Sequence, residues 1–186
     1  MIDSQLRDDL EYVSRTLQRN ERSAARPEIY VFWAFAILIG FALPDFAPEY
    51  AGWYWLVVGI VGGGATALYA GWREKRDGVI NDEEGKRWGL HMSLGGVAYI
   101  AVAIAMLMHP AEQAAQWATN FLLVTGLMYA LAGVHLDRGL LWPGLLALVG
   151  YTVFNIWPIE YVWTATGALM CVAMLMAAFT AARARK

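Results

Sequence analysis

Six long apolar runs, separated by short polar or proline-containing stretches, dominate this sequence. A helix needs roughly 20 apolar residues to cross a bilayer, and these runs approach that length. They lie near residues 28–43, 52–71, 89–108, 115–134, 140–157 and 161–182. Hydrophobic residues make up 59% of the chain and charged residues 16%, which is outside the range of ordinary soluble domains. We therefore predict an all-α, polytopic membrane bundle of six transmembrane helices in residues 28–182.

The prolines and the basic residues support this division of the chain. All six prolines fall at or beside proposed span ends, where proline costs a helix least. The Lys and Arg residues occur only in the N-terminal segment 1–27, in the loop 72–88, near residue 138 and in the tail 183–186. Basic residues are retained on the cytoplasmic side during insertion. We expect a multi-pass protein of a bacterial inner membrane with both termini in the cytoplasm.

Tryptophan and tyrosine residues gather near both ends of the proposed spans. Trp53, Trp55 and Trp163, for example, fall near the outer ends. Amphipathic rings at headgroup depth anchor membrane helices, so we interpret these residues as two aromatic belts. Between spans two and three, the charged stretch 72–88 is predicted to form a solvated hairpin. Asp77-Gly78 is a turn signal, and Asn81 with Glu84 resembles a capping box at which the third helix could start.

No ionisable residue lies in the middle of any proposed span. Transporters and pumps usually carry such residues, because burying a charge is costly and is retained for function. The sequence also lacks a Gly-x-Ser-x-Gly elbow, a His-Glu-x-x-His motif and a phosphate-binding loop. These observations argue against ion-coupled transport and favour a protein that is not an enzyme.

A few side chains allow metal or haem chemistry as an alternative. His91 and His135, both near cytoplasmic span ends, are a conceivable pair of haem ligands. His109 with Met106 and Met108 is a conceivable soft-metal site. The lone Cys171 is interpreted as a small core residue. Because interfacial histidine and lipid-facing methionine explain these positions better than a bound metal or haem does, we predict no metal and no cofactor.

Glycine residues cluster in spans two and three at matched depth. Small residues let membrane helices approach closely. We therefore predict a tight hairpin between these spans, packed through Gly59, Gly62, Gly63, Gly64, Gly95 and Gly96.

Uncharged polar residues gather in the outer halves of spans four to six. The set comprises Asn120, Tyr151, Thr152, Asn155, Thr164 and Thr166. Polar groups in apolar surroundings seek partners, so we expect these side chains to face one another. They either hold the helices together or line an outward-facing pocket for a small solute.

The N-terminal segment has the pattern of a two-sided helix. At 100° per residue, an apolar stripe and an arginine stripe fall on opposite sides. The apolar stripe is formed by Leu6, Leu10, Val13 and Leu17, and the basic stripe by Arg15, Arg19, Arg22 and Arg26. A narrow apolar stripe opposite a basic one suits packing on protein better than lying in a membrane interface.

Three functional hypotheses follow from these patterns. The first is a non-enzymatic regulatory or scaffold subunit, which contacts a cytoplasmic protein or a second copy through its N-terminal helix. The second is a small transporter, channel or sensor that binds a solute in the outer polar cluster. The third is a haem- or metal-binding redox subunit. The lipid bilayer is the one partner common to all three, and no direct nucleic-acid contact is expected.

Overall fold

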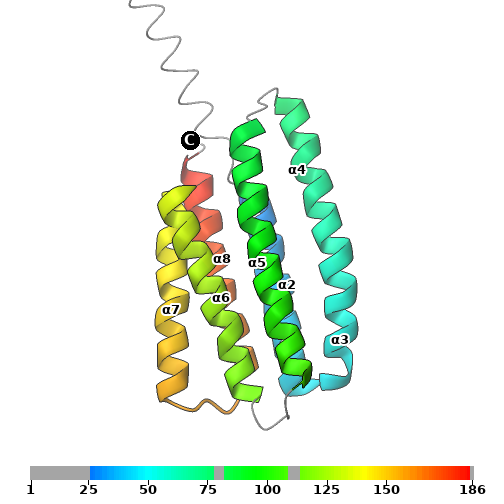
Figure 1. The fold of residues 1–186 in the computed structure, drawn as a ribbon, viewed down its shortest axis with the longest axis vertical. Helices are drawn as coiled ribbons and strands as arrows, with labels where there is room; N and C mark the ends of the chain where they lie inside the picture. Colours follow the sequence, from blue (N-terminus) through cyan, green and yellow to red (C-terminus); the bar gives the residue numbers. More distant parts are fainter. Residues whose placement is uncertain (1–25, 78–81, 109–113, 185–186) are drawn as a thin grey trace, which may run out of the picture.

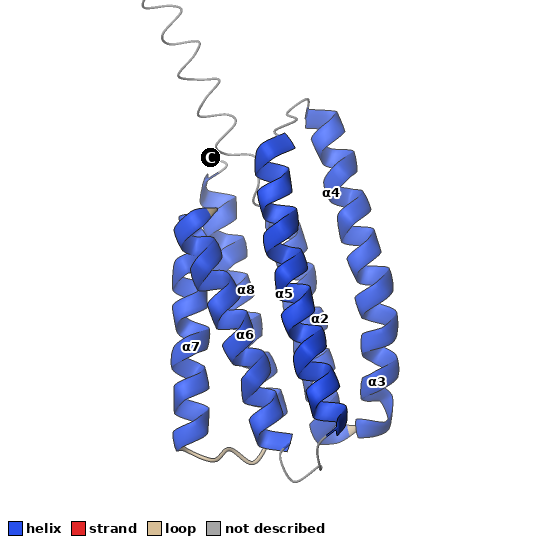
Figure 2. Ribbon diagram, viewed as in Figure 1, coloured by secondary structure: helices blue, strands red, loops and turns tan. Residues whose placement is uncertain are grey.

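A computed structural model describes residues 26–77, 82–108 and 114–184, and every regular element in these ranges is a helix (Figures 1 and 2). In chain order the elements are α2 (Pro27–Phe46), α3 (Pro48–Val57), the π-helical turn η1 (Val58–Gly62), α4 (Gly63–Asp77), α5 (Asp82–Met108), α6 (Ala114–His135), the 3₁₀ turn η3 (Arg138–Leu140), α7 (Leu141–Ile156) and α8 (Val162–Ala184).

Six helices in the described ranges are long and apolar enough to cross a membrane. The α3, η1 and α4 segments form a single helix over Pro48–Arg73, so they count as one crossing. Pro27 and Pro48 occupy the first turns of α2 and α3, where proline lacks only an amide that the helix would leave unbonded. The prediction of six apolar helices is confirmed.

The region 72–88 differs from the predicted solvated hairpin. Helix α4 continues to Asp77 and α5 begins at Asp82. This region is rich in Lys, Arg and Glu, which are good helix formers once a helix has been started by the apolar segment. Both helices therefore continue beyond the apolar stretches, and the predicted extent of this loop is corrected. The beginning of α5 at Asp82 agrees with the helix start expected from the sequence.

The two ends of the bundle differ in their charged residues. At one end lie Arg73, Arg138 and Arg183, and we call it the basic end. At the other lie Asp45 and Glu160, and we call it the acidic end. In Figure 1 the basic end is at the top, where α4 and α8 end. Among the described residues Lys and Arg are confined to the basic end, whereas Asp and Glu lie at both ends.

Helix α8 forms the centre of the packing, with α2, α6 and α7 around it. One cluster of buried residues near the basic end joins Tyr30, Tyr129, Leu140 and Ala177. A second cluster joins Ile37, Phe41, Leu122, Ala147 and Met170. Alanine is frequent where α8 is buried, because small side chains let membrane helices pack closely. The first and last helices of the described chain are thus close neighbours.

The backbones of helices α6 and α7 approach each other closely at two glycines. A Cβ atom added to Gly144 would lie 2.2 Å from the backbone nitrogen of Ala130. A Cβ atom on Gly133 would lie 2.4 Å from the backbone nitrogen of Leu141. No side chain fits at either position, so glycine determines the distance between these two helices.

Helix α5 and the α3–α4 helix lie outside this four-helix core. Only about 6% of each of their apolar stretches is buried, against 50% for α6. Helix α5 packs on α6, whereas α3 packs on the acidic end of α2. In Figure 1, α4 and α7 lie at opposite edges of the bundle.

Candidate functional site

Most of the predicted partner-binding residues lie outside the described residues. These are Leu6, Leu10, Val13, Leu17, Arg15, Arg19 and Arg22. Arg26 is described, and it does not belong to an exposed arginine stripe. It is only 7% exposed, and its carbonyl accepts the backbone N–H groups of Ile29 and Tyr30 at the start of α2. The prediction for Arg26 is therefore corrected: it joins the preceding segment to the basic end of the bundle.

The two predicted glycine groups are not brought together. Added Cβ atoms at Gly59, Gly63, Gly64 and Gly96 would meet nothing within 4 Å. Gly62 instead lies against the ring of Phe32 in α2, and Gly95 against Met128 in α6. The predicted hairpin packing through Gly59, Gly62, Gly63, Gly64, Gly95 and Gly96 is corrected. Two glycine groups at the same depth in the membrane do not determine which faces of their helices pack together.

The predicted outer polar residues form no shared network. The Asn155 amide donates to the carbonyl of Tyr151, and the Thr152 hydroxyl donates to the carbonyl of Leu148. Each of these bonds lies within α7, and the Asn155 and Thr152 side chains are exposed. A side chain that donates to the backbone carbonyl four residues earlier in its own helix needs no hydrogen-bond partner on a neighbouring helix.

The remaining members of this set differ from one another. Asn120 accepts a hydrogen bond from Gln116 of its own helix, and Tyr151 packs against the second core cluster. Thr166 is fully buried, and its hydroxyl has no hydrogen-bond partner among the described residues. The structure thus corrects the expectation that these residues face one another as a polar pocket or as interhelical polar contacts, except at Thr164.

Thr164 takes part in a polar link that the sequence did not indicate. The carboxylate of Asp45, at the end of α2, accepts the Thr164 backbone N–H at 2.7 Å and its hydroxyl at 2.6 Å. Unbonded amides and the helix dipole make the start of a helix favourable for an anion. Asp45 therefore caps α8 from another helix. Two features of the sequence could have indicated this cap: an acidic residue at the end of one span, and a threonine in the first turn of another.

An aromatic cluster fills the same half of the bundle. The ring centroid of Phe41 lies 5.7 Å from that of Trp55, 5.6 Å from Phe121 and 5.8 Å from Trp163. Trp55 and Trp163 therefore pack against the protein core, not only at the membrane surface as the belt interpretation holds. Trp53, 71% exposed, keeps the position expected for a belt residue.

Polar contacts attach α5 to α6. The His91 ring lies 2.9 Å from the carbonyl of Met128, and the Tyr99 hydroxyl bonds to that of Thr125. His91 thus has a structural partner, whereas His135 is exposed at the end of α6. In the ranges that the structure covers, no three His, Cys, Asp or Glu side chains are grouped to hold a metal ion.

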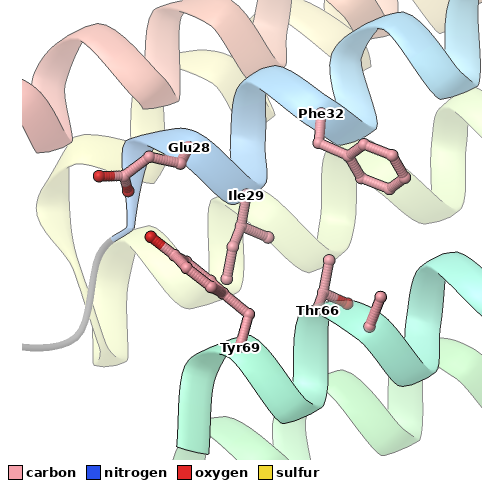
Figure 3. A pocket seen from close by; sticks show the side chains of 6 residues that line it. Glu28, Ile29, Phe32, Thr66 and Tyr69 are labelled. Atoms are coloured by element: carbon pink, nitrogen blue, oxygen red, sulfur yellow. The ribbon is translucent and has the colours of Figure 1, made fainter. Parts of the chain in front are cut away.

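A shallow, open groove lies between α2 and α4 (Figure 3). It encloses about 210 Å³ and is lined by Glu28, Ile29 and Phe32 of α2 and by Ala65, Thr66 and Tyr69 of α4. Small-molecule sites typically measure roughly 300–1,000 Å³ and bury most of the ligand. This open groove therefore suits part of an elongated molecule better than a compact substrate.

Every regular element in the described residues is helical, and six helices of membrane-spanning length and composition indicate a multi-pass membrane protein. Compared with protein-family models, curated protein sequences and solved structures, the chain has no significant match.

Proposed function

We propose that this protein is a non-enzymatic scaffold or regulatory subunit of a bacterial inner membrane, with both termini in the cytoplasm. Its N-terminal helix, with the leucine stripe of Leu6, Leu10 and Leu17, contacts a cytoplasmic partner or a second copy of the chain. The distribution of charge supports this role above all. In the described ranges every Asp, Glu, Lys and Arg lies near an end of a helix, and none lies at mid-span.

The attachment of the N-terminal segment adds to this support. Arg26, the first described residue, is buried, and Tyr30 in the first turn of α2 belongs to the core cluster of the basic end. A partner bound to the segment before Arg26 would therefore act close to the start of α2. A partner-binding role is also favoured over a solute site because Thr152 and Asn155 are exposed and bonded within α7.

A paired substitution in the apolar stripe tests the proposal. The variant carrying Leu10→Asp and Leu17→Asp places two charges on the proposed contact surface. Burying an unpaired charge at an interface costs several kcal/mol, so association is expected to be lost. The control carries Ser4→Asp and Gln18→Asp, which make the same change of charge on the side of the predicted helix away from the apolar stripe.

The measurements are chemical cross-linking in membranes, co-purification in mild detergent and the amount of protein in the membrane fraction. We expect the leucine variant to lose cross-linked or co-purifying species while it stays membrane-inserted, and the control to keep both properties. Unchanged cross-linking and co-purification in the leucine variant would refute the proposed contact.

A further inference from the structure

The groove between α2 and α4 is charged at one end and apolar along the rest of its length. Figure 3 shows Glu28 and Tyr69 together at one end, with Phe32 and Thr66 farther along. Arg73 follows Tyr69 by one helical turn, and its guanidinium lies 3.9 Å from the Glu28 carboxylate and 6.0 Å from the Tyr69 ring centroid. A carboxylate and a guanidinium therefore lie side by side at the mouth of an apolar groove.

The depth of this charged end matches the position of lipid headgroups. Glu28 lies in the first turn of α2, and Arg73 is the last residue of the membrane-length helix Pro48–Arg73. The apolar lining runs from there toward mid-span, where Gly62 packs against Phe32. The Thr66 hydroxyl in this stretch is bonded to the carbonyls of Gly62 and Gly63 of its own chain segment, so its hydrogen is not available to a ligand. The groove is therefore charged at headgroup depth and apolar toward mid-span, which matches the headgroup and the acyl chain of a phospholipid.

The charges at the mouth are accessible to a ligand. The side chain of Glu28 is 48% exposed and that of Arg73 27% exposed. An exposed ion pair at this separation contributes little stability, roughly 0–1 kcal/mol, so the contact between Glu28 and Arg73 itself opposes a bridging ligand only weakly. A guanidinium binds phosphate well, and a primary ammonium has three N–H donors for a carboxylate.

We propose that this groove binds a phospholipid whose headgroup carries a primary ammonium group beside its phosphate. The phosphate contacts Arg73, the ammonium contacts Glu28, and one acyl chain lies along Ile29, Phe32 and Ala65. A quaternary ammonium headgroup has no N–H to donate to Glu28, and a glycerol headgroup has no cation. The Glu28 carboxylate therefore distinguishes these headgroups, because it attracts a cation and accepts hydrogen bonds from its N–H groups.

The headgroup is tested by native mass spectrometry of the purified, delipidated full chain. The protein is offered equal amounts of phosphatidylethanolamine, phosphatidylcholine and phosphatidylglycerol with identical dioleoyl chains. We expect phosphatidylethanolamine to be retained preferentially. Because a hydrogen bond to a charged group contributes about 1.5–3 kcal/mol, Glu28→Gln should reduce this preference about tenfold or more. The matched control is Glu49→Gln, at the acidic end of the bundle.

The acyl chain is tested by filling the groove. Ala65→Phe should reduce retention of all three lipids, whereas Ala67→Phe, on the same helix outside the lining, should leave it unchanged. Equal retention of the three lipids by the original protein would overturn the proposal. So would a preference for phosphatidylglycerol that Glu28→Gln leaves intact, because attraction to the basic end then explains binding. Identical behaviour of the two phenylalanine variants would place the lipid elsewhere. These outcomes do not depend on the proposed N-terminal contact.

Discussion

Gly144 offers a quantitative test of how α6 and α7 pack. The substitution Gly144→Ala adds one methyl group, whose carbon would lie 2.2 Å from the backbone nitrogen of Ala130. Ordinary van der Waals contact begins at 3.4 Å, so the two helices must separate by about 1.2 Å at this point. The obstacle is backbone, and no side-chain rotation relieves it.

The expected cost combines two opposing effects. Overpacking of this kind costs about 1–3 kcal/mol, and a gap of 0.5–1 Å removes a quarter to a half of the dispersion energy of the contacts around it. Replacing glycine by alanine within a helix returns about 0.5–1 kcal/mol. The net destabilisation of Gly144→Ala is therefore about 1–2 kcal/mol, or about a tenfold change in the unfolding equilibrium.

The assay is equilibrium unfolding in mixed micelles with increasing dodecyl sulfate, followed by the fluorescence of the nine tryptophans. The matched control is Gly64→Ala, where an added Cβ meets nothing within 4 Å, so stability should be unchanged or slightly higher. Ala130→Gly should not rescue Gly144→Ala, because the clash is with a backbone atom. Equal stabilities of the Gly144 and Gly64 variants, or rescue by Ala130→Gly, would refute the reasoning.

Three further predictions concern the ends and the edge of the bundle. Asp45→Asn should destabilise the protein by about 1 kcal/mol through loss of the charged cap on α8, and by more than Glu49→Gln, which removes a first-turn charge of α3 that makes no hydrogen bond to another helix among the described residues; thermal unfolding in detergent compares them. Tyr99→Phe should lower stability by roughly 0.6 kcal/mol, the average for a hydrogen bond between membrane helices, in the same unfolding assay. In intact cells, a membrane-impermeant maleimide should label Glu160→Cys and not Arg76→Cys if the basic end is cytoplasmic, and the reverse pattern would overturn the proposed orientation.

The existence and length of the membrane helices could be predicted from the sequence. Apolar runs such as the one that became α6 are long, contain no charge and end at polar residues, so hydropathy locates them without any tertiary information. The helical extension to Asp77 was missed, because charged residues were assigned to a loop although they continue a helix readily.

The pairing of the helices could not be predicted in the same way. Apolar side chains surround each span on all sides, so the sequence does not show which face meets protein and which meets lipid. Gly64 and Gly144 look alike in sequence, yet one faces open space and the other touches the backbone of α6. The hydrogen bond between Asp45 and Thr164 joins residues far apart in the chain, and a local sequence pattern does not show which distant residues lie in contact.

The packing of α2 against α8 has a consequence for the order of events during synthesis. The ribosome produces α2 first among the six membrane helices and α8 last, yet α8 is the helix on which α2 packs most extensively. The hairpin of α6 and α7, by contrast, joins neighbours in the chain and can close as soon as both have been inserted. Helix α2 must therefore remain in the lipid without its main partner until translation of α8 is complete. Assembly of this bundle is a process that follows insertion, and α8 is the helix that completes it.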